Sequence, residues 1–368
     1  MDCPQIQSTR YRDFSKRLHG SGTGPRLPLD GSIEVTARCN LRCAHCYINE
    51  PAGDPQSKER ELTLAEVCDL LDQMADEGCL WLLLTGGEPF VRPDFLEIYT
   101  YAKKKGFLIT LFTNGTALTP RIADHLADWR PFAIEITLYG RTRETYERVT
   151  GVPGSYERCL RGVDLLLERD LSLRLKTMVM TLNRHEVGDM EAYATSLGVE
   201  FRSDAMLNVR LDGGRQPAQL RLSPEEVIAL DLADEKQMQA WGEFCEIFGG
   251  PPPRPEYLYQ CGAGLGTFHI DAYGGLSACI MSRQPNYDLR QGTFHEAWHD
   301  FLPQVRAQQW TVDTPCRHCE LMAMCGQCPG WARMETGNQE ARVDYLCEVA
   351  HLRAKALGLD GYKTGGNR

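Results

Sequence analysis

Short apolar runs, which are typical of buried strands, alternate along the chain with segments of helical periodicity. The apolar runs cover residues 32–36, 81–84, 108–113, 133–138, 173–180 and 199–207. The helical segments between them cover residues 64–75, 93–105, 121–128, 154–169 and 185–196. Successive strands that are joined through helices favour a parallel sheet with right-handed crossovers. The sequence therefore predicts the α/β fold class, as a curved, partial (β/α)6 barrel of TIM-like type.

The pattern changes after Leu211, and this change divides the chain into regions. Ser223 and Pro224 open a further helix, and residues 249–253 have the composition of a stiff linker. Beyond this linker, seven cysteines crowd into one stretch. We expect an N-terminal extension (1–30), the barrel (31–210), a bridging region (211–255), a cysteine-rich domain (256–350), and a helix end with a tail (351–368).

Composition and charge narrow the classes of function. The chain has 368 residues, of which 42% are hydrophobic, so it can bury a substantial core. Its net charge of −10 argues against a nucleic-acid partner, because binding to a phosphate backbone requires a basic face. No apolar run approaches the ~20 residues of a membrane span, and we see no signal peptide. Fifteen cysteines without an export signal predict a cytoplasmic protein whose thiols ligate metal.

Three cysteines directly follow the first predicted strand. Cys39, Cys43 and Cys46 are spaced so that they could ligate three irons of a four-iron cluster and leave the fourth iron open. A disulfide would leave the third thiol unexplained, and structural zinc normally takes four ligands in CxxC pairs. We therefore favour an iron–sulfur cluster on the loop that leaves this strand.

A glycine-rich segment follows the second predicted strand. Gly86 and Gly87 let the backbone pass close to a ligand, and Glu88, before Pro89, supplies an acceptor for an ammonium group. Taken alone, this segment is most often a turn. It gains meaning because the carboxyl ends of parallel barrel strands meet at one rim, where the three cysteines also lie.

Together, these motifs resemble the CxxxCxxC and GGE motifs of the radical S-adenosylmethionine (SAM) superfamily. The resemblance implies that the open iron binds SAM, that the segment from Gly86 to Pro89 holds its methionine amine, and that one electron then gives a 5'-deoxyadenosyl radical. His45 departs from the aromatic residue that is frequent before the last cysteine. Further candidate SAM contacts, each of which also suits a packing or surface residue, are Tyr47, Asn114, Thr137, Arg148 and Lys176.

The C-terminal cysteines resemble the SPASM auxiliary-cluster domain, although one gap is two residues where three are usual. The resemblance implies one cluster held by Cys316, Cys319, Cys325 and Cys347. It implies another held by Cys261, Cys279 and Cys328, which brings the total to three 4Fe-4S clusters. The fourth iron of the cluster held by Cys261, Cys279 and Cys328 is either left open or ligated by Cys245 or by a residue other than cysteine. A zinc ribbon fits poorly, because the gap between Cys319 and Cys325 is too short.

The remaining motifs and cysteines are assigned no firm role. The five other cysteines suit packing, and Cys245 is named as a candidate hydrogen-atom donor; otherwise the catalytic residue is unknown. Residues 262–266 lack the spacing of a dinucleotide loop. His295 to His299 matches HExxH, the zinc-protease pattern, but it falls where SPASM proteins commonly have an amphipathic helix.

The resemblance implies a radical SAM oxidoreductase that modifies a ribosomally synthesised precursor peptide by cross-linking, oxidation or epimerisation. We expect flavodoxin or ferredoxin as reductant, and a discrete leader-peptide recognition protein in trans because the first thirty residues are too short for that domain. One alternative is a sulfatase-maturating enzyme, but Ile280 stands where that family has a catalytic Asp. A small-molecule dehydrogenase is another alternative. A non-catalytic iron–sulfur electron carrier is a poorer one, because it has no need of the Gly86–Pro89 motif.

Overall fold

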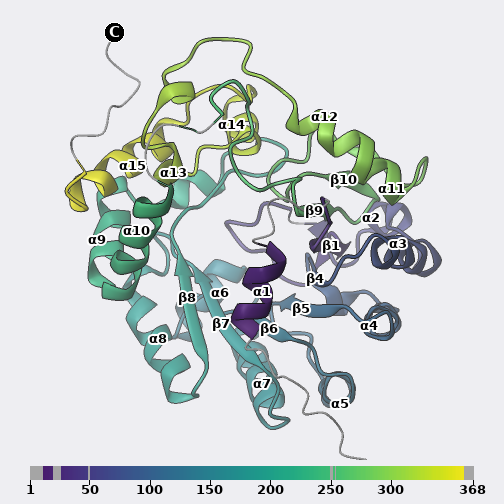
Figure 1. The fold of residues 1–368 in the computed structure, drawn as a ribbon. Helices are drawn as coiled ribbons and strands as arrows, with labels where there is room; N and C mark the ends of the chain where they lie inside the picture. Colours follow the sequence, from purple (N-terminus) through teal and green to yellow (C-terminus); the bar gives the residue numbers. More distant parts are fainter. Residues whose placement is uncertain (1–10, 20–25, 49, 249–251, 253, 360–368) are drawn as a thin grey trace, which may run out of the picture.

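A curved parallel sheet organises the computed structural model, which describes residues 11–19, 26–48, 50–248, 252 and 254–359 (Figure 1). Most of the expected linker at 249–253, and the end of the expected tail at 360–368, lie outside the described residues. Within the described chain, no helix is long and apolar enough to cross a membrane.

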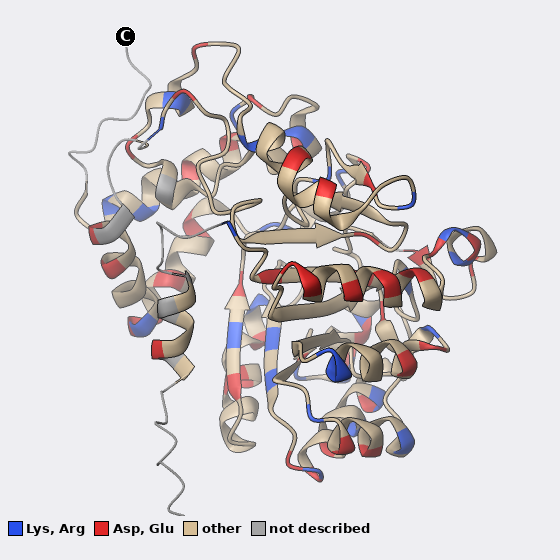
Figure 2. Cartoon of the chain, turned by 45° about the vertical axis from the view of Figure 1, so that its right-hand side comes forward, with Lys and Arg blue, Asp and Glu red and all other residues tan. Residues whose placement is uncertain are grey.

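Six parallel strands lie side by side in the order of the sequence. They are β1 (Asp30–Thr36), β4 (Trp81–Gly86), β5 (Leu108–Thr113), β6 (Ala133–Thr137), β7 (Leu173–Met178) and β8 (Glu200–Asp204). The predicted fold class is confirmed, because each predicted strand is present and pairs with its neighbour in parallel. The strand at the open edge, β8, and its neighbour β7 carry Arg174, Lys176 and Arg202 (Figure 2).

Helices cover the outer face of this sheet (Figure 1). They are α3 (Leu64–Asp76), α4 (Phe95–Lys104), α5 (Pro120–Asp128), α6 (Arg143–Thr150), α7 (Ser155–Leu167) and α8 (Val187–Ser196). Thr63 caps α3 through a reciprocal capping box with Glu66, as its sequence predicts. Helix α6 was not predicted. Only residues 151–154 separate it from α7, and this connection begins and ends with a glycine in the left-handed conformation, Gly151 and Gly154.

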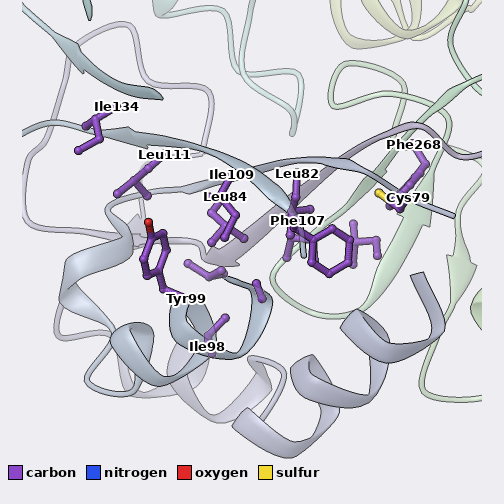
Figure 3. Packing of buried hydrophobic residues seen from close by; sticks show 14 of the residues in the cluster. Cys79, Leu82, Leu84, Ile98, Tyr99, Phe107, Ile109, Leu111, Ile134 and Phe268 are labelled. Atoms are coloured by element: carbon purple, nitrogen blue, oxygen red, sulfur yellow. The ribbon is translucent and has the colours of Figure 1, made fainter. Parts of the chain in front are cut away.

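The main core lies between the sheet and these helices (Figure 3). Leu84 and Leu111 point from the sheet toward Ile98 and Tyr99 of α4, and all four side chains are fully buried. Strand side chains alternate between faces, so the core residues Ile33 and Val35 leave Glu34 on the inner face of β1. The inner face of the barrel can therefore carry polar groups without disturbing the core.

The cysteine-rich region continues the same sheet, which the sequence did not predict. Strand β9 (Thr267–Ile270) pairs in parallel with β1, and β10 (Gly275–Ser277) and β11 (Tyr287–Asp288) follow in antiparallel fashion. These strands have two to four residues, too few to show a clear period. The boundaries proposed for the barrel and the cysteine-rich domain stay predictions, although backbone hydrogen bonds join the two.

Shorter elements complete the described chain. Ser223 caps α9 (Pro224–Ala233), which confirms the helix predicted there, and α9 packs against α15 (Asp344–Ala356). The remaining helices are α1 (Tyr11–His19), α2 (Pro55–Arg60), α10 (Glu235–Phe248), α11 (Phe294–Glu296), α12 (Leu302–Arg306), α13 (Met322–Cys325) and α14 (Pro329–Thr336). The others are β2 (Arg38–Cys39), β3 (Glu50–Pro51), the π-helical turn η4 (Ala297–Phe301), and the 3-10 turns η1 (Pro89–Val91), η2 (Arg184–Glu186), η3 (Pro217–Leu220) and η5 (Pro315–His318).

The same glycine-to-alanine change should have opposite effects in two helices. A Cβ on Gly162 of α7 would lie 2.2 Å from the carbonyl oxygen of Gly115, so G162A should destabilise the fold by about 1–3 kcal/mol. A Cβ on Gly242 of α10 meets nothing within 4 Å, so G242A should stabilise it by about 0.5–1 kcal/mol. Thermal unfolding measures both, and equal shifts would contradict the close contact between α7 and Gly115.

Candidate functional site

The loop that carries the first three cysteines is anchored by its backbone. The amides of Arg42 and Ala44 donate to the carbonyls of Thr150 and Val149 at the end of α6, each at 2.9 Å. Helix α6, which the sequence analysis missed, therefore fixes the shape of this loop. The anchoring leaves the three thiols on a rigid support at the carboxyl end of β1.

The thiols of this loop are close and screened from water. Burial raises the pKa of Cys39 to about 12 and raises that of Cys43 well above its ordinary value. The charges of Cys39 and Cys46 act on Cys43 in the same direction, so the three groups interact electrostatically. Without a bound cation Cys39 and Cys43 stay protonated at neutral pH, and a metal that binds thiolates removes the penalty.

The glycine motif packs directly against the start of this loop. Gly86 has φ of 135°, and a Cβ there would lie 2.1 Å from the Thr36 carbonyl oxygen. A Cβ on Gly87 would lie 2.3 Å from the carbonyl oxygen of Arg38. The end of β4 can approach the chain before Cys39 this closely only because both residues lack side chains.

Glu88 is buried and held in one orientation. Its carboxylate accepts hydrogen bonds from the Thr113 hydroxyl at 2.8 Å and from the Asn114 amide at 2.7 Å. Burial raises its pKa to about 7. Pro89 begins η1 and is also buried. A buried carboxylate with this pKa suits a site that receives a cationic group, which would restore its charge.

Asn114 connects the glycine motif to the cysteine loop. Its side-chain amide lies 3.6 Å from the Cys39 sulfur and donates to the Asn40 oxygen at 2.9 Å. The structure therefore brings together Cys39, Glu88 and Asn114, which lie far apart in the sequence. Asn40 was not predicted, and its position inside the CxxxCxxC motif was the only available signal.

The other predicted SAM contacts divide into two groups. Thr137 hydrogen-bonds Tyr139, which in turn reaches Cys43, so Thr137 lies near the cysteine loop. Tyr47 is turned toward Glu34 on β1. By contrast, Arg148 of α6 is exposed, and its guanidinium donates to the carbonyl of Leu182 at 2.6 Å.

Lys176 lies on the inner face of β7 and already has partners. Its ammonium is 3.1 Å from Glu135 and lies over the ring of Phe112. Burial lowers its pKa to about 7 in spite of the carboxylate. Arg202 of β8 also pairs with Glu135 at 2.5 Å, so two cations share one carboxylate on this face.

The C-terminal cysteines gather into two groups, with the membership that the resemblance implies. Burial raises the pKa of Cys328, and charge interactions with Cys279 and Cys261 add to this rise. The second group consists of Cys316, Cys319, Cys325 and Cys347. Burial raises the pKa values of Cys316, Cys325 and Cys347, and charge interactions within the group add to the rise. Cys245 packs instead with Leu321, Met324 and Ala354, beside Cys319. It is therefore not grouped with Cys261, Cys279 and Cys328.

The spacing of the sulfurs distinguishes between two kinds of metal site. Among the described residues, no three cysteine sulfurs all lie within 4.8 Å of one another. A tetrahedral zinc ion with Zn–S bonds of about 2.3 Å would hold them about 3.8 Å apart. A four-iron cluster places each thiolate on a different iron and therefore spaces them more widely. The thiols of the described chain are therefore not pre-arranged around a single zinc ion.

A buried ion pair connects the barrel to the cysteine-rich region, and sequence reasoning missed it. Arg283, four residues after Cys279, donates to both carboxylate oxygens of Glu34, one of them at 2.8 Å. Burial raises the pKa of Glu34, and Tyr47 hydrogen-bonds the same carboxylate. An acidic residue between Ile33 and Val35 was the available signal, but nothing in the sequence named its partner.

A cavity of about 320 Å³ opens beside the first cysteine loop. Its lining consists of Arg42, Cys43, Ala44, Cys46, Arg210, Gln216 and Pro217. Two of the three thiols therefore face a space that a bound group could occupy. The lining joins the cysteine loop to the segment after β8, so this segment closes one side of the site.

Comparison with known proteins identifies the family. The model of the Radical SAM superfamily matches residues 33–194. The AdoMet-dependent heme synthase of Methanosarcina barkeri is 36% identical, over 86% of this chain and 93% of that protein. The chain belongs to the radical SAM superfamily. As a radical SAM enzyme it uses S-adenosylmethionine and a 4Fe-4S cluster.

The comparisons also include a bacteriocin biosynthesis protein and a solved structure. The subtilosin biosynthesis protein AlbA of Bacillus subtilis is 25% identical, over 84% of this chain and 68% of that protein. Streptococcus suis SuiB, solved with S-adenosylmethionine, superposes with a TM-score of 0.67 over 94% of this chain and 83% of SuiB, at 14% identity. This last likeness shows that the two proteins share a fold.

Replacing Glu88 tests whether it receives the SAM ammonium group. E88Q keeps the shape but cannot carry charge, so we expect SAM to bind about tenfold or more weakly, measured by anaerobic equilibrium dialysis. Wild-type affinity should also fall as the pH drops below about 7, because the carboxyl then holds its proton, and E88Q should lose this dependence. The exposed E97Q on α4 is the control. Unchanged binding by E88Q would refute this role.

Proposed function

We propose that this radical SAM enzyme carries three 4Fe-4S clusters and removes a hydrogen atom from a carbon of a peptide substrate. Cys39, Cys43 and Cys46 would hold the SAM cluster. These cysteines fall into three groups within which the charge of one thiolate acts on another, and this grouping is the observation that carries the proposal. The auxiliary clusters would be held by Cys261, Cys279 and Cys328, and by Cys316, Cys319, Cys325 and Cys347.

The residues of this chain would position SAM and shield the reaction. When bound, the first cluster supplies the electron that splits SAM into methionine and a 5'-deoxyadenosyl radical. Glu88 would pair with the ammonium of SAM, and the bare backbone at Gly86 and Gly87 would let that group come close. Asn114 holds the loop of Cys39 in register with this site. Burial of these groups would confine the radical and keep it away from competing C–H and S–H bonds.

A peptide substrate is supported by the relatives and by the charge of the inner face. AlbA is named for subtilosin biosynthesis, and SuiB has been solved with its precursor peptide SuiA. On the inner face, Glu34 neutralises Arg283, and Glu135 pairs with Lys176 and Arg202. Such paired cations are a poor match for a polyanion and suit a substrate of low charge. The cross-link, oxidation or epimerisation would take place in the cytoplasm.

Partner proteins would complete this activity. Flavodoxin or ferredoxin would reduce the SAM cluster, and a discrete recognition protein would present the leader of the precursor peptide. The first auxiliary cluster would have an open iron, because Cys245 packs beside Cys319 rather than with Cys261, Cys279 and Cys328. Sulfatase maturation fits less well, because Ile280 offers no base.

A second candidate is the modification of a tetrapyrrole. The relatives with the higher identities favour it, namely the heme synthase and, at 34% identity, the Fe-coproporphyrin III synthase of Methanosarcina barkeri. Heme precursors carry carboxylate side chains, which require cationic partners. The arginines beside the first cysteine loop, Arg42 and Arg210, are the groups nearest to such a role.

Iron content tests the cluster assignment. Anaerobic reconstitution should give about twelve irons per chain, on the order of three four-iron clusters. The triple variant C39A/C43A/C46A should lose about one third of this iron and all cleavage of SAM, because the other clusters do not bind SAM. C68A, a half-buried cysteine of α3, is the control and should change neither. SAM cleavage by the triple variant would overturn the assignment.

Product analysis tests the substrate class. The reconstituted enzyme, with SAM and a reductant, is given either Fe-coproporphyrin III or the small precursor peptides encoded beside its gene. We expect a peptide to stimulate 5'-deoxyadenosine formation and to change in mass, with the porphyrin unchanged. Heme formation would establish the second candidate instead, and formylglycine in a sulfatase-derived Cys or Ser peptide would support sulfatase maturation.

A further inference from the structure

The HExxH segment forms a cluster of ligand-type side chains away from the SAM site. Its glutamate does not take part: Glu296 caps its own helix through Thr293 and accepts a hydrogen bond from Tyr287 at 2.8 Å. A zinc protease needs this glutamate beside the metal as a general base. The protease pattern is therefore fortuitous, and the two histidines need a different explanation.

Both histidines face a carboxylate from another part of the fold. His295 Nδ1 lies 2.5 Å from one oxygen of Glu77, and His299 Nε2 lies 2.9 Å from the other. The two imidazole rings are 4.4 Å apart between centroids. Within the described chain, these are the only three Asp, Glu, His or Cys side chains whose donor atoms all lie within 4.8 Å of one another.

The position of Glu77 favours a cation at this point. It is the C-cap residue of α3, where the negative end of the helix dipole disfavours a carboxylate, and the last turn of α3 has no basic residue. Asp300 and Glu296 add further negative charge around His295. A divalent ion bound here would neutralise much of this negative charge.

We propose that Glu77, His295 and His299 bind a structural divalent transition metal, with zinc as the expected ion. Two imidazoles and one carboxylate form a donor set that zinc accepts, and water would complete the tetrahedron because both histidines are exposed. Glu296 is engaged by Thr293 and Tyr287 and is not available as the general base of a protease, so we assign the ion a structural rather than a hydrolytic role.

The site would fasten the barrel to the C-terminal part of the chain. Glu77 ends α3 on the outer layer of the barrel, and the histidines lie on α11 and the π-helical turn η4 (Figure 1). The Phe294 amide already donates to Gln73 of α3 at 2.7 Å, so the two elements are in register before any ion binds. Metal binding would add a second connection at the exposed rim of this contact.

Zinc binding to the reconstituted enzyme tests the proposal. Anaerobic calorimetry should show that the wild type binds one zinc ion per chain. The affinity for zinc should be at least tenfold lower in H295A/H299A and in E77Q. X-ray absorption at the zinc edge should show nitrogen and oxygen neighbours only. Zinc should also raise the unfolding temperature of the wild type by several degrees, but not that of H295A/H299A.

Controls separate this site from the iron–sulfur sites. H185A removes an exposed histidine that also lies near a carboxylate, Glu186, and it should leave zinc affinity unchanged. All variants should keep wild-type iron content and SAM cleavage, so these readouts verify folding and test the proposed function separately. Sulfur neighbours at the zinc edge, or equal zinc affinity in H295A/H299A, would overturn the proposal.

Discussion

The close approach between the ends of β1 and β4 is the constraint on which the rest of the site depends. The two strands pair in parallel, and their register shifts between Glu34 and Thr36, just before the chain turns toward Cys39. The amides of Gly87 and Glu88 donate to the carbonyls of Thr36 and Arg38, at 2.8 and 2.9 Å. A side chain at Gly87 would separate these backbones. The cysteine loop and Glu88 thus share one backbone framework, and neither can move without the other.

Buried ion pairs hold this framework in place from both sides. Arg38 and Glu61 are almost fully buried and form a two-pronged pair at 2.9 Å, which ties the start of the cysteine loop to the segment before α3. Arg283 and Glu34 play the same part between β1 and the loop after Cys279. Such pairs add little net stability, because their desolvation offsets their attraction, but breaking one leaves an unpaired buried charge. The Arg38–Glu61 pair therefore favours one shape of the barrel rim, and the Glu34–Arg283 pair favours one arrangement of the barrel and the cysteine-rich region.

Local signals decided what could be predicted from the sequence. The barrel strands and outer helices followed from periodicity, and the motif containing Cys39 is local and specific. Strand β9 was missed because four residues show no clear period, and α6 because it lies so close to α7. The Glu34–Arg283 pair spans 249 residues, so it depends on the packing of the finished fold. The SAM role assigned to Arg148 rested on resemblance alone and stays a prediction.

Packing and thiol chemistry together imply that the two parts of the molecule depend on metal to different degrees. One continuous apolar core joins the sheet and helices of the barrel to the first part of the cysteine-rich region, including Phe268, Phe294 and Trp298. Beyond Trp310 the cysteine-rich region has small separate cores, such as the one around Trp331 and Leu346 and the one beside Cys245. Most of its cysteines are partly buried with raised pKa values, so without metal they add desolvated polar groups and little apolar burial. Because ligand binding by such thiols is coupled to folding, the clusters would contribute much of the stability of residues 316–350, while the barrel and residues 258–310 would fold on their shared apolar core.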